Sequence, residues 1–347
     1  MVYLLPATIP PRRPKSPVLD VIHCVDALTL LKALPDNYVH CIVTSPPYWG
    51  LRDYQVDGQI GLEATLPEYI DNLVTIFREA RRVLRDDGTF FLNLGDSYAS
   101  GEIGRHDSVE GRRIDGKPIG KKFTERQQRK IRTGLKPKDL MMIPARVAIA
   151  LQDDGWYLRQ DNIWSKPNPM PESVKDRTTT AHEHVFHLTK SERYWYDADA
   201  IREAHIWADK DKRSKDGKKH KNKTGKTLSG QYKTNGTSYH PNGRNRRSVW
   251  EIATKPFSAA HFATFPEALA QICILAGCPK GGIVYDPFMG AGTTALVAQK
   301  LGRHYLGSEL NPEYVDLANH RLQNRLDEHQ AKVNGQPHTL HMFGESA

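Results

Sequence analysis

The stretch that most constrains this chain is an apolar run, residues 39–43, that leads directly into Thr44-Ser45-Pro46-Pro47-Tyr48. The length and β-branched content of the run predict a buried strand. Each proline restricts the residue before it, and neither has an N–H to pair with nearby carbonyls, so we expect a stiff, acceptor-lined lip. With Tyr48 beside it, this lip suits a flat ligand that bears an exocyclic amino group. The alternative is a proline turn whose aromatic ring packs in the core.

Strand-like and helix-like patterns alternate along the chain. Strands are predicted at residues 18–26, 39–43, 89–94, 156–165, 184–189, 283–285 and 304–308. Helices are predicted at residues 27–34, 66–84, 143–153, 266–276, 292–301 and 312–326. We expect Asp86-Asp87-Gly88 to end the second helix. The alternation predicts an α/β fold with a doubly wound, mostly parallel sheet.

A second motif, Asp-Pro-Phe-Met-Gly-Ala-Gly-Thr-Thr at residues 286–294, lies between a predicted strand and a predicted helix. Gly290 and Gly292 permit a tight turn close to a ligand, and the helix N-terminus offers N–H groups to a carboxylate. The motif lacks the lysine of a Walker A loop and the last glycine of G-x-G-x-x-G. Asp286 suits an amino or sulfonium group, and Glu309 suits ribose hydroxyls. Together these features describe S-adenosylmethionine, whereas a turn that serves only packing is the alternative.

The net charge of +9 over 347 residues is concentrated in two segments. Residues 101–138 contain 12 Lys/Arg against 5 Asp/Glu, and residues 201–250 contain 14 against 4, so the remainder is acidic. This distribution favours a polyanionic partner over solvated loops, and the second segment is too polar to bury a core. Because no apolar run approaches ~20 residues and no secretory core is present, we expect a cytoplasmic protein with reduced cysteines.

The two motifs resemble those of the amino-directed DNA methyltransferases, which methylate N4 of cytosine or N6 of adenine. Residues 286–294 are similar to the cofactor loop of that family, and residues 44–48 are similar to its catalytic motif. Their order, with a variable segment between them, resembles the β group. Residues 164–169, 176–177, 182–183 and 261–266 resemble further segments of the family. The resemblance covers residues 18–200 and 250–326, and it implies S-adenosylmethionine as cofactor and double-stranded DNA as partner.

The resemblance implies roles for three sets of residues. The catalytic set is Ser45, Pro46, Pro47 and Tyr48. The cofactor-binding set is Asp26, Thr44, Phe265, Asp286, Pro287, Phe288, Gly290, Gly292, Thr293, Thr294, Glu309 and Asn311. The DNA-binding set is Lys166, Asn168, Arg177, Arg244, Arg246 and Arg247. No metal site is expected, because His182, His184 and His187 lack His-Glu-x-x-His spacing.

The target base decides the reaction. The Ser45 hydroxyl and the Pro46 carbonyl are expected to accept hydrogen bonds from the amino group, and Tyr48 is expected to stack on a flipped base. The C5-cytosine route requires a Pro-Cys pair that this chain lacks. Serine at the first motif position favours N4 of cytosine, with N6 of adenine as the alternative. A DNA-binding protein without catalysis and a methyltransferase for small molecules or proteins are the rival classes.

We expect one methyltransferase domain, built from segments with different tasks. These are an irregular arm (1–17), a catalytic half (18–200) with a basic insertion at about 101–138, a basic target-recognition insertion (201–250), a cofactor-binding half (251–326) and a tail (327–347). Any restriction endonuclease partner is expected to be a separate chain. Both a monomer and a homodimer are compatible with the sequence.

Overall fold

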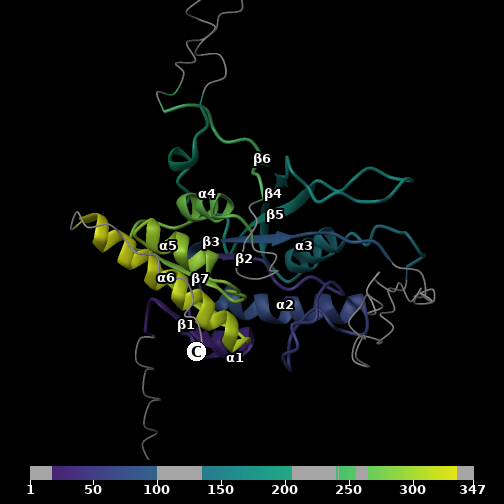
Figure 1. Cartoon of the computed structure of the whole chain (residues 1–347), viewed down its shortest axis with the longest axis horizontal. Helices are drawn as coiled ribbons and strands as arrows, with labels where there is room; N and C mark the ends of the chain where they lie inside the picture. Colours follow the sequence, from purple (N-terminus) through teal and green to yellow (C-terminus); the bar gives the residue numbers. More distant parts are fainter. Residues whose placement is uncertain (1–17, 100–134, 205–239, 241, 255–264, 334–347) are drawn as a thin grey trace, which may run out of the picture.

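The computed structural model describes residues 18–99, 135–204, 240, 242–254 and 265–333. Its centre is an eight-stranded sheet in the order β1-β8-β7-β2-β3-β5-β4-β6 (Figure 1). The strands are β1 (Val21–Cys24), β2 (Val39–Thr44), β3 (Leu84–Leu94), β4 (Tyr157–Ser165), β5 (His182–Thr189), β6 (Val249–Glu251), β7 (Ile283–Asp286) and β8 (His304–Glu309). Neighbouring strands are parallel except where β5 meets β3 and β4. The predicted mostly parallel sheet is confirmed.

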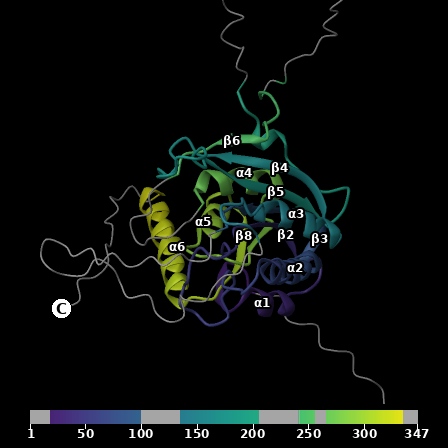
Figure 2. The same ribbon diagram turned by 90° about the vertical axis from the view of Figure 1, so that its right-hand side faces the viewer.

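Helices cover both faces of this sheet (Figures 1 and 2). They are α1 (Ala27–Ala33), α2 (Leu66–Val83), α3 (Ile143–Asp153), α4 (Glu267–Gly277), α5 (Thr293–Lys300) and α6 (Pro312–Val333), with a short 3-10 turn, η2 (Asp199–Ile201). Successive strand residues point to opposite faces. Ile42 and Phe90 therefore pack with α1, α2 and α3, whereas Val43 and Phe91 pack with α4, α5 and α6. The doubly wound architecture follows from this alternation.

Helix α2 begins where its sequence predicts. Thr65 accepts a hydrogen bond from the backbone N–H of Glu68, whose side chain accepts one from the Thr65 N–H, and Pro67 lies in the first turn. This capping box satisfies two N–H groups that a helix start otherwise leaves unpaired. The buried side chains of α2 follow helical spacing, and its fully buried Leu73 and Phe77 anchor the helix to the sheet.

The predicted end of α2 is wrong. The helix stops at Val83, and β3 begins at the next residue, so Asp86-Asp87-Gly88 lies inside the strand. Leu84 pairs with Val39 of β2, and the register shifts before Thr89 pairs with Cys41. The irregular stretch is therefore accommodated as a local break in register, because pairing with β2 on both sides of it outweighs the turn tendency of the three residues.

Part of the second basic segment also departs from expectation. Strand β6 begins at Val249, inside residues 201–250, and pairs with β4, and its Trp250 is 4% exposed. The segment therefore contributes to the core at this point. Residues 100–134 and 205–239, which hold most of both basic segments, lie outside the described residues, as do residues 1–17. Helix α6 continues to Val333, beyond the predicted limit of 326.

The sheet order brings strands from early and late in the chain together. Strands β7 and β8 lie between β1 and β2, and Cys41 of β2 pairs with Val284 of β7. The carboxyl ends of β1, β8, β7 and β2 therefore meet at one edge, where the strand order reverses. Among the described residues, none of the helices combines the length and apolar character needed to cross a membrane.

Candidate active site

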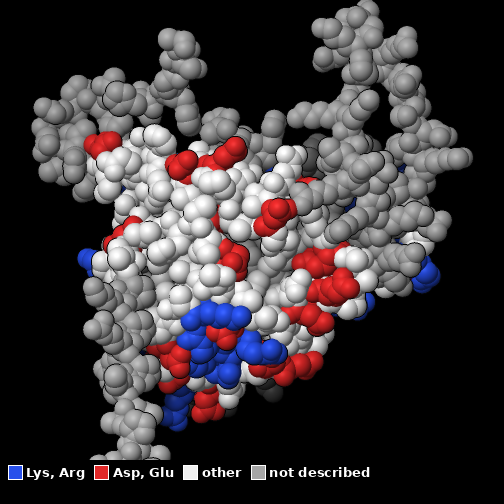
Figure 3. Space-filling model, turned by 90° about the horizontal axis from the view of Figure 1, so that it is seen from below, with Lys and Arg blue, Asp and Glu red and all other residues white. Residues whose placement is uncertain are grey.

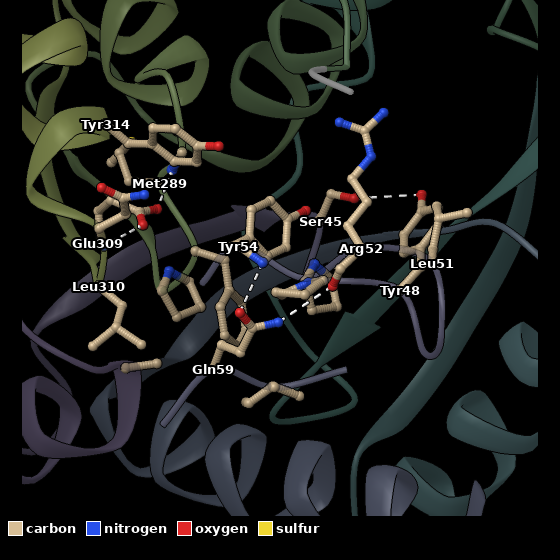
Figure 4. Close-up of a pocket in the computed structure, with 18 of the residues that line it drawn as sticks. Ser45, Tyr48, Leu51, Arg52, Tyr54, Gln59, Met289, Glu309, Leu310 and Tyr314 are labelled. Carbon is tan, nitrogen blue, oxygen red and sulfur yellow. Dashed lines mark hydrogen bonds between the residues drawn. The ribbon is translucent and has the colours of Figure 1, made fainter. Parts of the chain in front are cut away.

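A cavity of about 1030 Å³ opens at this edge of the sheet (Figure 4). Asp26 follows β1, Ser45 follows β2, Pro287 follows β7, and Glu309 ends β8, and all four line the cavity. Glu183 reaches the same edge from the start of β5, because β5 runs antiparallel to β3. Ligands of open α/β sheets bind in such a crevice at the carboxyl ends of the strands.

The predicted lip is one wall of the cavity, since Ser45, Pro46, Pro47 and Tyr48 all line it. The Pro47 carbonyl accepts a hydrogen bond from the Tyr69 hydroxyl of α2 at 2.9 Å. Gly61 has a φ of +97°, and a Cβ there would lie 3.1 Å from the Tyr48 carbonyl oxygen. Helix α2 therefore contacts the lip at Pro47, and the backbone at Gly61 packs closely against it at Tyr48. The expectation that its carbonyls lack donors is wrong for Pro47.

Tyr48 is fixed at both its ring and its hydroxyl. The hydroxyl donates to Glu183 Oε2 at 2.6 Å, and Ser45 Oγ donates to the Tyr48 hydroxyl at 3.4 Å. Burial, together with the neighbouring Glu183 carboxylate, raises the pKa of Tyr48 well above its ordinary value. A Cβ at Gly95 would lie 2.7 Å from Tyr48 Cε2, so glycine leaves room for the ring. Stacking of Tyr48 on a base stays a prediction.

Glu183 is a site residue that the sequence reading placed in no functional set. It accepts hydrogen bonds from Asn93 Nδ2 at 2.9 Å and from Lys166 Nζ at 2.5 Å, in addition to Tyr48. Lys166 also lies over the Trp164 ring, 4.6 Å from its centroid. Asn93, Trp164, Lys166 and Glu183 all line the cavity. The sequence signal was its place in residues 182–183, which resemble a segment of the amino-directed DNA methyltransferases.

Asp286 points into the protein and does not line the cavity. It is 1% exposed and accepts hydrogen bonds from Thr44 Oγ1 (2.5 Å), Thr294 Oγ1 (2.6 Å) and the Phe288 N–H (3.0 Å). Burial raises its pKa to about 6, although these hydrogen bonds oppose the shift. Thr44, Asp286 and Thr294 therefore join β2, β7 and α5 beneath the cavity. The expectation that these three residues face the cofactor is not met by this geometry.

The glycines of the second motif have different tasks. Gly290, with a φ of +53°, lines the cavity, and its N–H donates to Glu309 Oε2 at 2.8 Å. Gly292, with a φ of +78°, precedes α5, and a Cβ there would lie 2.7 Å from Ala318 Cβ of α6. Gly292 therefore permits close helix packing and does not line the cavity, whereas Pro287, Phe288 and Thr293 do.

Four further members of the predicted cofactor set, Asp26, Phe265, Glu309 and Asn311, line the wall opposite the lip. Glu309 Oε1 accepts from the Asn311 N–H at 2.8 Å, and burial raises the pKa of Glu309. Asp26 caps α1 by accepting from the Thr29 N–H at 2.9 Å. Partial burial of Asp26 opposes ionisation, but the hydrogen bonds from Thr29 and its neighbours lower its pKa. Both carboxylates retain lone pairs for ligand hydroxyl or amino groups.

A loop after the catalytic motif forms the cavity rim, which no sequence signal indicated. Gln59 pins this loop by accepting from the Tyr54 N–H at 2.8 Å and donating to the Arg52 carbonyl at 3.2 Å (Figure 4). The Tyr54 ring meets Tyr314 of α6 edge-on, with centroids 6.2 Å apart. The carboxylates of Asp26 and Glu309, apolar Phe288 and this aromatic pair fit a nucleoside with a cationic sulfonium tail.

Comparisons with known proteins agree with this geometry. Residues 39–320 match the model of the DNA methylases, the family of N6 and N4 methyltransferases. This chain belongs to that family. Membership confirms the predicted enzyme class, a DNA methyltransferase that acts on an exocyclic amino group with S-adenosylmethionine as its cofactor.

Similar proteins include several type II methyltransferases. The chain is 51% identical to M.Cfr9I of Citrobacter freundii, in an alignment of 298 residues that covers 86% of each protein. It is 46% identical over 303 residues to M.SmaI of Serratia marcescens, which covers 86% of this chain and 89% of that one. Among solved structures, the cytosine-N4-specific PvuII DNA methyltransferase shares the fold with a TM-score of 0.58 and 19% identity, over 91% of this chain and 93% of that one.

The residues predicted to bind DNA occupy several different positions on this methyltransferase. Lys166 lines the cavity, whereas Asn168 forms reciprocal hydrogen bonds with the Thr254 backbone. Arg177 pairs with Glu172 at 2.5 Å and lies over the Tyr98 ring. The remaining three, Arg244, Arg246 and Arg247, gather around Glu203 at 2.9, 3.9 and 3.3 Å. These pairs hold surface loops together, and DNA contact by the six residues stays a prediction.

The face opposite α4 and α5 shows mixed charges. Figure 3 shows Lys and Arg side chains gathered in one patch, with Asp and Glu within and around it. On α2, which lies on this side in Figure 1, Arg78 pairs with Asp154, and Arg82 pairs with Asp36 (2.5 Å) and Glu79 (2.8 Å). The protein therefore balances cations of this helix with its own carboxylates.

The histidines of β5 have different partners, although the rings of His182 and His184 also meet edge-on, with centroids 5.5 Å apart. His184 Nδ1 lies 3.0 Å from Asp161, and His187 stacks on Phe91 with centroids 4.8 Å apart. Burial lowers the pKa of His187 to about 4, so its ring is neutral at physiological pH. Within the part of the chain that the structure describes, no group of three potential metal ligands occurs.

Proposed function

We propose that this methyltransferase transfers a methyl group to N4 of a flipped cytosine at a specific DNA site. The observation that carries the proposal is the placement of Ser45 at the cavity wall, with its hydrogen donated to Tyr48 and its lone pairs therefore available to an amino group. Adenine N6 is the alternative target, and an inactive DNA-binding homologue is the third reading. The shared fold of a cytosine-N4-specific enzyme is consistent with cytosine.

The lip residues prepare the amino group for attack. The lone pair of an exocyclic amine is delocalised into the ring, so hydrogen bonds to Ser45 Oγ and to the Pro46 carbonyl favour the form whose lone pair is free. Bound S-adenosylmethionine supplies an electrophilic methyl group on a sulfonium. Glu309, Asp26 and Phe288 orient the nucleoside part of the cofactor from the opposite wall. Positioning of this kind lowers the barrier by up to ~7–11 kcal/mol.

We infer that cofactor binding and base binding are divided between the two sides of the sheet edge. The walls contributed by β1, β7 and β8 carry the predicted cofactor residues, whereas those from β2, β3, β4 and β5 carry Ser45, Asn93, Lys166 and Glu183. A base that enters beside the lip therefore faces the cofactor across the cavity. Flipping costs a few kcal/mol, which contacts with the pocket offset. The basic segments at 101–138 and 201–250 are proposed to hold the duplex and select the site.

The chain aligns with most of the length of type II methyltransferases, so we propose a modification role beside a separate restriction endonuclease in the cytoplasm. The test uses purified protein, unmethylated genomic DNA and isotopically labelled S-adenosylmethionine, followed by digestion to nucleosides and mass spectrometry. N4-methylcytosine is the expected product. N6-methyladenine would overturn the choice of base while the enzyme class stands, and unmodified DNA with cofactor bound would favour the inactive homologue.

A further inference from the structure

A one-way chain of hydrogen bonds runs from the lip to β5. Ser45 Oγ donates to the Tyr48 hydroxyl at 3.4 Å (Figure 4), and the Tyr48 hydroxyl donates to Glu183 Oε2 at 2.6 Å. All three side chains line the cavity. These hydrogen bonds require a tyrosine at the fourth motif position, because a phenylalanine ring could stack on a base but could not connect Ser45 to a carboxylate.

Glu183 determines the direction of the chain. An ionised carboxylate only accepts hydrogen bonds, so Asn93 Nδ2, Lys166 Nζ and the Tyr48 hydroxyl must all donate to it. The 2.5 Å contact with Lys166 balances its charge, and its side chain is 15% exposed. With its hydrogen committed to Glu183, the Tyr48 oxygen is left to accept from Ser45. Neighbouring hydrogen bonds that point the same way strengthen one another.

The direction matters because a serine hydroxyl can both donate and accept. A Ser45 that donated toward the base would compete with the amino hydrogens, whereas activation of the amino group requires an acceptor. We propose that Glu183 is a positioning residue that acts through Tyr48 to hold Ser45 as a hydrogen-bond acceptor and to receive the proton that the methylated amino group loses. This inference rests on the proposed function and deepens it.

The proton transfer balances along the same bonds. As the bond from the amino nitrogen to the methyl carbon forms, the sulfur–methyl bond breaks and its electron pair stays on sulfur. The nitrogen then carries an extra proton and a positive charge. It gives that proton to Ser45 Oγ, while Ser45 passes its own hydrogen to Tyr48, and Tyr48 passes its hydrogen to Glu183. The nitrogen and Glu183 both end neutral.

Other titratable groups surround Glu183 and must be separated from it in any pH experiment. Lys166 reaches it from β4, and Tyr48 reaches it from the lip. On its own strand it is flanked by His182 and by His184, the latter beside Asp161. Substitution of Tyr48 by phenylalanine tests the hydrogen-bond chain separately from these groups, because it removes one neutral hydroxyl and leaves every charge in place.

The test compares full-length wild type with Tyr48→Phe, Glu183→Gln and the double variant. Single-turnover methyl transfer is measured against pH at saturating DNA and S-adenosylmethionine, and cofactor affinity is measured separately. Tyr285→Phe is the matched control, because it also removes a buried tyrosine hydroxyl, here 3.3 Å from Ser308, at a residue that does not line the cavity.

Each single variant is expected to slow methyl transfer on the order of 10²-fold at neutral pH, within the range of general acid–base effects. The double variant should be no slower than the slower single variant, since both interrupt one chain. Wild type is expected to lose rate at acid pH, because a protonated carboxyl group cannot receive the proton, and all three variants should lack this decline. Cofactor affinity should stay within about twofold of wild type, and the control should match wild type throughout.

Two outcomes would overturn the inference while leaving the proposed function standing. One is that wild type methylates DNA and Tyr48→Phe retains both the rate and the acid decline. The other is that the losses of the two single variants add in the double variant. Should Glu183→Gln fail to fold, Tyr48→Phe alone still decides the matter. A wild type that binds the cofactor but methylates no DNA would instead refute the proposed function itself, and the inference with it.

Discussion

Replacing Asp286 by asparagine is expected to stabilise the protein at neutral pH. Burial raises the pKa of this carboxyl from 3.8 to about 6, despite three hydrogen bonds to it. A difference of about two pKa units corresponds to about 3 kcal/mol. The folded state of wild type holds the Asp286 proton more tightly than the unfolded state does. The contribution of the protonated carboxyl group to wild-type stability is therefore fully present below pH 3.8 and is lost as the pH rises through about 6, whereas asparagine loses nothing.

The asparagine fits the same hydrogen bonds. Its carbonyl oxygen would replace Oδ1 of Asp286, which accepts from Thr44 and from the Phe288 N–H. Its amide nitrogen would donate to Thr294 Oγ1, whose own hydrogen can turn to the Val43 carbonyl oxygen at 3.3 Å. The substitution therefore removes a buried charge and retains three hydrogen bonds, while the second hydrogen of the amide adds a buried donor that costs about 1–3 kcal/mol at every pH.

The assay is urea unfolding of wild type and Asp286→Asn between about pH 4 and pH 8. The variant should gain stability relative to wild type as the pH rises, by about 3 kcal/mol across the range. Asp316→Asn, on the exposed side of α6, is the control and should leave the free energy of unfolding near that of wild type. A variant that is less stable than wild type by the same amount at every pH would refute the reasoning.

Three further substitutions test the site and its scaffold. Ser45→Ala should abolish methyl transfer in a single-turnover assay while DNA and cofactor affinities, measured by titration, stay near wild type; retained turnover would exclude Ser45 as the acceptor. Glu309→Gln should weaken S-adenosylmethionine binding about tenfold by calorimetry, as expected for a lost charged hydrogen bond of ~1.5 kcal/mol, and an unchanged affinity would contradict its ribose role. Gly292→Ala should lower the free energy of unfolding by more than the ~1–2 kcal/mol of left-handed strain, because its Cβ also meets Ala318. Gly281→Ala, at a φ of +75° with open space around it, is the control and should show the strain alone. Equal losses in the two variants, measured by urea unfolding, would refute the packing role of Gly292.

Local patterns predicted the elements because those patterns act within a few residues. Pro67 marked the first turn of α2, and continuous apolar runs identified the central strands, which are buried along most of their length. Asp86-Asp87-Gly88 misled because pairing with β2, a tertiary effect, carried the strand through it. Strand β6 was missed for a similar reason, since only its neighbour β4 makes a three-residue strand in a polar segment stable.

The parts of the site that are built from consecutive residues could be predicted from the sequence. The lip and the glycine turn could be located because their backbone restrictions are written in consecutive residues. Glu183 and Tyr48 are 135 residues apart, and Thr44 and Asp286 are 242 apart, so neither contact has a local signal. The inward direction of Asp286 depends on two threonines that the sequence cannot place. Such contacts depend on the sheet order.

That sheet order has a consequence for folding. Strands β1 and β2 are synthesised early, yet β7 and β8, which separate them, are made more than two hundred residues later. Until then both strands present unpaired edges, which are sites for mispairing and aggregation. Closing so long a loop makes the insertion of β7 and β8 slow and late. A nascent chain is therefore expected to require shielding by chaperones and to remain inert until this central pair of strands has emerged from the ribosome.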